Sequence, residues 1–127
     1  MESRSSLILC VADSNLRLQY LARAVKKAGC NFVLSNSAHN AVAMAAITNE
    51  LDAAVLDEDM VLGEGSVAES IKAVKSLPIL LVCDAGPTGP NPAGVDLITA
   101  NGSRQQIAAA LHKLLQPRVS TSRVISR

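Results

Sequence analysis

Three consecutive acids, Asp57, Glu58 and Asp59, follow the apolar run AAVL, and a fourth acid, Asp13, follows the apolar run LILCVA. Carboxylates that converge at one place repel each other unless a hard cation such as Mg²⁺ lies between them. An aspartate beside bound Mg²⁺ can also attack phosphorus and form an acyl phosphate. The question is therefore whether the fold brings Asp13 and Asp57 together, or leaves the three acids as a solvated cluster at a strand end.

Short aliphatic runs alternate with amphipathic stretches along the 127 residues, a length that suits one domain. The aliphatic runs predict strands at 7–11, 31–34, 53–57, 78–83 and 95–100. The amphipathic stretches predict helices between Ser14 and Gly29 and over 37–50, 65–75 and 103–116. Strands this apolar are typical of a parallel sheet buried on both faces. We therefore predict an α/β, flavodoxin-like, doubly wound fold with a five-stranded parallel sheet in the order 2-1-3-4-5.

The first predicted helix has one apolar face. Leu18, Leu21, Val25 and Ala28 recur at helical spacing, and this pattern indicates the side that packs on the sheet. Arg17 and the other cations of this helix lie mostly off that face.

Two segments depart from a regular alternation. The stretch DAGPTGPNPAG, residues 84–94, holds prolines that remove hydrogen-bond donors and clash with helical turns. The fourth helix of the pattern is therefore expected to be missing or reduced to a turn. Residues 117–127 begin at a helix-ending proline and carry three arginines and no acid. We expect a folded domain over residues 1–116, followed by a flexible basic tail or linker over 117–127.

Sites on open α/β sheets form at the carboxyl ends of the strands, near the point where the strand order reverses. In the predicted order that point lies between the first and third strands. Asp13 follows the first strand, and Asp57 ends the third. These two side chains are expected to face each other across one crevice.

At these residues the sequence resembles a known family. The stretches ILCVADSNLRLQYLARAVKKAG, LDAAVLDEDMVLGEG and LPILLVCDA resemble the receiver domain of two-component response regulators, over roughly residues 6–116. The family has an aspartate at the end of strand three, a methionine three residues later, then proline, and a glycine eight residues after the aspartate. Here those places hold Asp57, Met60, Val61 and Gly65.

The resemblance implies a phosphorelay function. Asp57 would accept a phosphoryl group from a histidine kinase or a phosphotransfer protein, with Mg²⁺ as cofactor. The ligands of the metal would be Asp13, Asp57 and the backbone carbonyl of Asp59. The chain would then be a bacterial signalling protein rather than an enzyme, and homodimerisation is left open.

Four substitutions depart from the family pattern. Ala12 stands in place of the first acid of the pair, and Cys83 in place of a Ser or Thr at the end of strand four. Ile98 stands in place of the aromatic switch residue, and Asn101 in place of a lysine. A phosphoryl group brings about two negative charges at neutral pH, which a lysine would hold by a charge-assisted bond. A thiol is also a weak donor compared with a hydroxyl.

Cys83 and Asn101 favour an alternative function of a different class. The chain would be a pseudo-receiver, a protein-interaction or dimerisation module that works without phosphorylation. Its contact surface would be the last strand and helix or the loop at 84–94. A nucleotide-binding or cofactor-binding enzyme is disfavoured, because the sequence contains no GxGxxG after the first strand and no P-loop.

Composition excludes several classes of partner. The net charge is +1, with one Phe, one Tyr and no Trp, so neither a basic surface nor a stacking platform for nucleic acid is expected. No apolar run is long enough to span a bilayer. Cys10, Cys30 and Cys83 have no zinc-site spacing and are expected to be reduced, mostly buried thiols of a cytoplasmic protein.

Overall fold

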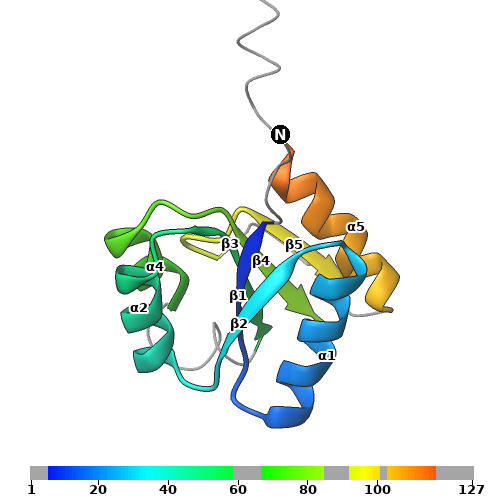
Figure 1. The fold of residues 1–127 in the computed structure, drawn as a ribbon, viewed down its shortest axis with the longest axis horizontal. Coiled ribbons are helices and arrows are strands. Elements are labelled where there is room, and N and C mark those ends of the chain that lie inside the picture. The colour runs from blue at the N-terminus through cyan, green and yellow to red at the C-terminus, as the bar shows by residue number, and fades with distance from the viewer. Residues whose placement is uncertain (1–5, 59–66, 85–91, 101–102, 117–127) are drawn as a thin grey trace, which may run out of the picture.

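Strands and helices alternate along the chain (Figure 1). The structure is a computed structural model that describes residues 6–58, 67–84, 92–100 and 103–116. The strands are β1 (Leu7–Val11), β2 (Asn31–Ser35), β3 (Leu51–Asp57), β4 (Ile79–Cys83) and β5 (Leu97–Ala100). The helices are α1 (Asn15–Lys27), α2 (Ala38–Ile47), α4 (Val67–Val74) and α5 (Arg104–Leu115).

The five strands form one parallel sheet in the order β2-β1-β3-β4-β5. This confirms the predicted doubly wound, flavodoxin-like fold. The register sets Cys10 of β1 beside Val55 of β3, and Val55 beside Leu80 of β4. Because apolar side chains of neighbouring strands line up in this way, the middle of the sheet buries both faces, as a parallel sheet requires.

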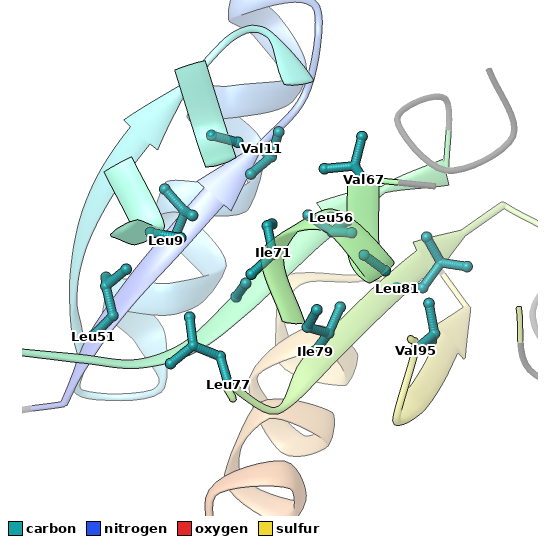
Figure 2. Packing of buried hydrophobic residues seen from close by; sticks show 14 residues of the cluster. Leu9, Val11, Leu51, Leu56, Val67, Ile71, Leu77, Ile79, Leu81 and Val95 are labelled. Carbon is teal, nitrogen blue, oxygen red and sulfur yellow. The ribbon is translucent and has the colours of Figure 1, made fainter. Parts of the chain in front are cut away.

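Two separate cores lie on the two faces of the sheet. Helices α2 and α4 cover one face, where Leu9, Leu56 and Leu81 of the strands pack with Val67 and Ile71 of α4 (Figure 2). Helices α1 and α5 cover the other face (Figure 1). Its core is formed by residues that include Ile8, Val55, Val82, Leu21 and Ile107. Alternate residues of each strand thus enter opposite cores, which fixes the strands and their ends relative to the helices.

Serine side chains begin the helices where the sequence predicted them. The hydroxyl of Ser14 accepts a hydrogen bond from the backbone N–H of Arg17 at 3.2 Å. Ser37 does the same for Asn40 at 3.1 Å, and Ser103 for Gln106 at 3.1 Å. Such caps satisfy backbone donors that a helix start leaves without partners. The start of α1 is therefore fixed close to the end of β1.

Some boundaries differ from the prediction. Helix α2 ends at Ile47 rather than at residue 50, and β3 begins at Leu51 rather than at residue 53. Strand β5 begins at Leu97 rather than at residue 95, and the side chain of Asp96 before it accepts the backbone N–H of Ile79 at 2.8 Å. The same carboxylate also accepts a bond from the ammonium of Lys72 at 2.7 Å. Asp96 thus bonds to Ile79 both through its side chain and through its backbone N–H, which donates to the carbonyl of Ile79 at 2.9 Å.

The connection between β4 and β5 contains no helix in its described part, which is Asp84 and residues 92–96. This agrees with the predicted loss or reduction of the fourth helix, although residues 85–91 lie outside the described residues. The predicted tail at 117–127 also lies outside them. Among the helices that the structure describes, none has the length and apolar character needed to cross a bilayer.

Gly94, at the end of this connection, has a backbone φ of +85°. A Cβ atom at this residue would come within 2.8 Å of the backbone nitrogen of Glu69 and 2.9 Å of the carbonyl carbon of Ala68. Both atoms belong to the backbone of α4, so they cannot move aside easily. Glycine is therefore required both by the backbone conformation and by the close approach to α4.

We expect Gly94→Ala to lower the free energy of unfolding by about 2–4 kcal/mol, because left-handed backbone strain and a backbone clash add together. Gly29 is a matched control, since it has the same φ of +85° but a Cβ atom there would meet nothing within 4 Å. Gly29→Ala should cost only the strain, about 1–2 kcal/mol. Urea denaturation of both variants measures the difference, and equal losses would contradict a close contact between Gly94 and α4.

Candidate functional site

Asp57 is the last residue of β3, the central strand. It lies at the carboxyl end of the sheet, where the strand order reverses between β1 and β3. Its neighbour across the sheet on one side is Val82 of β4. On the other side Val11 of β1 pairs with Leu56, so the chain leaves β1 beside Asp57. The side chain of Asp57 is only 3% exposed. A carboxylate therefore lies buried at the place where the sequence predicted the site.

Arg17 supplies the charge that compensates this carboxylate. It lies in the first turn of α1, three residues after the N-cap Ser14. Its Nε donates a hydrogen bond to Oδ1 of Asp57 at 3.0 Å, and its Nη2 donates to the same oxygen. Burial of an ionised carboxylate is costly unless it is paired and hydrogen-bonded, and Arg17 meets both needs.

Asp84, the residue after β4, joins the same group of charges. Nη2 of Arg17 lies 3.9 Å from Oδ1 of Asp84. The backbone N–H of Asp84 donates to Oε1 of Glu58 at 2.6 Å. Glu58, which follows Asp57, thus links the end of β3 to the end of β4. One guanidinium and one glutamate together connect α1, β3 and β4 at this edge.

Sequence reasoning missed the roles of Arg17 and Glu58. Arg17 was expected only to lie off the apolar face of its helix, and Glu58 only to be one of three adjacent acids. One available signal was the spacing of Arg17 from the N-cap Ser14, since the first turn of a helix that follows β1 starts at the carboxyl edge of the sheet. That spacing places the backbone of Arg17 at the carboxyl end of the sheet, but it does not show which carboxylate the side chain contacts.

Two of the three predicted magnesium ligands, Asp13 and Asp57, lie in the described part of the chain. Asp13 is exposed, whereas Asp57 is buried, and Asp59 lies outside the described residues. Ala12, where a second acid is expected in the family, is fully buried and offers only a methyl group. Among the described residues no group of three or more His, Cys, Asp or Glu side chains could hold a metal ion. The predicted Mg²⁺ site stays a prediction, because one of its three ligands, the carbonyl of Asp59, lies outside the described residues.

The remaining three substituted positions lie on β4, on β5 and after β5. Cys83 ends β4 and is partly buried against the core under α2 and α4. Ile98 of β5 pairs with Leu81 and packs against the same core. Asn101 lies outside the described residues. Cys83 and Ile98 thus act as apolar packing residues.

Burial raises the pKa of the Cys83 thiol, and the nearby carboxylates of Glu58, Asp57 and Asp84 raise it further. A thiol with a raised pKa carries its proton at neutral pH, so Cys83 is a poor nucleophile and a weak hydrogen-bond donor. Burial also raises the pKa of Cys10 to about 12. Neither thiol has the character of a reactive cysteine.

Comparison with known proteins identifies the fold. No family model matches the sequence, and no curated protein matches it. Solved structures do match. The N-terminal domain of a response regulator/sensory box/GGDEF three-domain protein from Carboxydothermus hydrogenoformans superposes with a TM-score of 0.70 and 20% identity, over 94% of this chain and 99% of that chain.

A chemotaxis response regulator of Vibrio cholerae has a TM-score of 0.70 and 21% identity, over 88% of this chain and all, 100%, of that chain. A response regulator receiver protein from Pseudomonas putida has a TM-score of 0.69 and 20% identity, over 88% of this chain and 99% of that chain. The chain therefore has the fold of response regulator receiver domains, which confirms the fold that the resemblance implied. Identity this low shows the fold alone, and a fold does not assign the roles of individual residues.

We expect Cys83 to react slowly with iodoacetamide at neutral pH, because its raised pKa leaves little thiolate there. The rate assigned to Cys83, taken as the difference between the wild type and Cys83→Ser by intact mass, should rise only above the ordinary pKa of a thiol. Glu58→Gln keeps an oxygen that can accept the Asp84 N–H but removes a negative charge. It should therefore shift the rise to lower pH, and an unchanged profile would contradict the assigned cause.

Proposed function

We propose that this chain is a receiver-like signalling module that works through protein contacts, without phosphorylation of Asp57. The observation that carries the proposal is the pairing of Asp57 with Arg17. The carboxylate that would receive a phosphoryl group is 3% exposed and already bonded to a cation of the same chain. We further propose that the module is cytoplasmic and is not an enzyme.

The chemistry of phosphoryl transfer supports this proposal. A phosphoryl group brings about two negative charges, which a site must hold with cations and strong donors. At the expected places Ala12 provides a methyl group and Cys83 a protonated thiol with a raised pKa. Arg17 is a suitable cation, but it is already bonded to Asp57 itself.

A surface groove away from Asp57 is consistent with binding of a protein partner. It is open and lies between α1 and β2, and it is lined by residues that include Arg23, Lys26, Lys27, Phe32, Leu34 and Arg104. Four cations around two apolar side chains are complementary to an acidic segment that carries apolar residues. We propose an acidic protein segment, rather than a small anion, as the partner for this groove.

A second function is favoured by the location of Asp57. This residue ends β3 at the reversal of strand order, and within the described part of the chain both hydrogen bonds to its carboxylate fall on Oδ1. Oδ2 could therefore attack phosphorus if Arg17 first moved away. Asp57 would then be the phosphoacceptor for a histidine kinase or a phosphotransfer protein.

Incubation with a small phosphodonor and Mg²⁺ separates the two functions. We expect intact mass to show no phosphoryl adduct on the wild type, and the same result for Asp57→Asn. An active receiver domain treated in parallel serves as the positive control. A base-labile adduct on the wild type that is lost in Asp57→Asn would overturn the proposal and favour phosphotransfer.

A further inference from the structure

The guanidinium of Arg17 lies where three parts of the fold meet, namely the first turn of α1, the end of β3 and the residue after β4. It donates to Asp57 through two nitrogens and lies 3.9 Å from the carboxylate of Asp84. Its side chain is 31% exposed, whereas that of Asp57 is 3% exposed. The cation is thus the more exposed partner of the pair.

We infer that Arg17 is an internal cation that takes the place of a divalent metal ion beside Asp57 and keeps such an ion away from it. The inference rests on the proposed function, because both depend on the pairing of Arg17 with Asp57. It adds a specific residue that would oppose metal binding at Asp57, besides the methyl group of Ala12 in place of a second acid.

Repulsion between two cations at one carboxylate supports the inference. Both donors of Arg17 bond to Oδ1 of Asp57, with Nε at 3.0 Å. A magnesium ion would need to approach a carboxylate oxygen to about 2.1 Å. At that distance from the carboxylate it would stand close to a guanidinium, and the two positive charges would repel each other strongly in a site of low solvent exposure.

The residue type also supports the inference. Arginine stays protonated at every pH at which the protein is folded, and its planar fork suits a carboxylate better than a lysine ammonium does. A cation in the first turn of a helix is unfavourable, because the helix dipole is positive there. Helix α1 has no acid in that turn to offset this effect. The carboxylate of Asp57 is therefore what makes Arg17 favourable at this place.

The surrounding bonds hold the arrangement in place. Glu58 accepts the N–H of Asp84 at 2.6 Å and so fixes the end of β4 beside the end of β3. Ser14 caps α1 and accepts the backbone N–H of Arg17 at 3.2 Å. The backbone of Arg17 and the backbone of Asp84 are thus held by bonds that do not involve the guanidinium, so Arg17→Met should leave the surrounding fold in place.

Paramagnetic Mn²⁺ tests the inference, since it broadens NMR signals of amides near its binding site. We compare ¹⁵N-labelled wild type with Arg17→Met, Arg17→Lys and the double variant Arg17→Met with Asp57→Asn. Arg23→Met, which removes a charge from the lining of the groove on the same helix, is the control for net charge. Excess Mg²⁺ added afterwards shows whether any broadening comes from a site that both ions share.

We expect the wild type, Arg17→Lys and Arg23→Met to show no saturable broadening at Ala12, Asp57 and Glu58. Arg17→Met should show it, with at least about tenfold tighter binding than the wild type, because a repelling charge is gone. Excess Mg²⁺ should reverse it, and the added Asp57→Asn should abolish it.

Three results would overturn the inference: binding at Asp57 in the wild type, no binding in Arg17→Met, or equal binding in Arg17→Met and Arg17→Lys. These results differ from those that test the proposed function. A phosphoryl adduct on the wild type that forms equally well in a chelator would end the proposed function and leave this inference standing. Metal binding by the wild type without any phosphoryl adduct would end this inference and leave the proposed function standing.

Discussion

A buried carboxylate must have a countercharge, and this requirement governs the carboxyl edge of the sheet. Asp57 is almost fully buried, and the idealised cost of moving such an ion from water to a protein interior is of order 20 kcal/mol. Real sites reduce that cost by pairing and hydrogen bonding. Here a single arginine does both, and it lies on a helix that begins immediately after the neighbouring strand. The site is therefore neutralised from within the chain.

The two cores make this pairing possible. Alternate residues of β3 enter opposite faces of the sheet, where α2 and α4 pack on one side and α1 and α5 on the other. Because β1 and β3 are adjacent and parallel, the start of α1 lies beside the end of β3. The apolar packing thus brings Arg17 to Asp57, and the ion pair in turn joins α1 to β3. Loss of Arg17 would leave an uncompensated charge at a place that the rest of the fold keeps buried.

The fold could be predicted from the sequence because its determinants are local. The aliphatic runs, the capping serines and the proline-rich segment each indicate one element, and parallel topology then limits the strand order. The location of Asp57 at a strand end also followed from these patterns. The expected approach of Asp13 to Asp57 stays a prediction, since burial shows only that Ala12 is buried and Asp13 is exposed where the chain leaves β1.

The pairing of Arg17 could not be predicted, because helical periodicity shows which residues lie off the apolar face but not what their side chains contact. A long cationic side chain on the edge of a helix is usually solvated. Only the tertiary structure shows that a buried carboxylate lies within its reach. The same holds for Glu58, whose bond to the Asp84 N–H depends on the pairing of β3 with β4.

A double-mutant cycle of Arg17 and Asp57 tests most directly whether their interaction is the constraint on which this edge depends. The free energy of unfolding is measured by urea denaturation for the wild type, Arg17→Met, Asp57→Ala and the double variant. We expect a coupling energy of about 1–3 kcal/mol, because either single change leaves the other charge without its partner. Losses that add to within about 0.5 kcal/mol would contradict this constraint, since the two side chains would then be energetically independent.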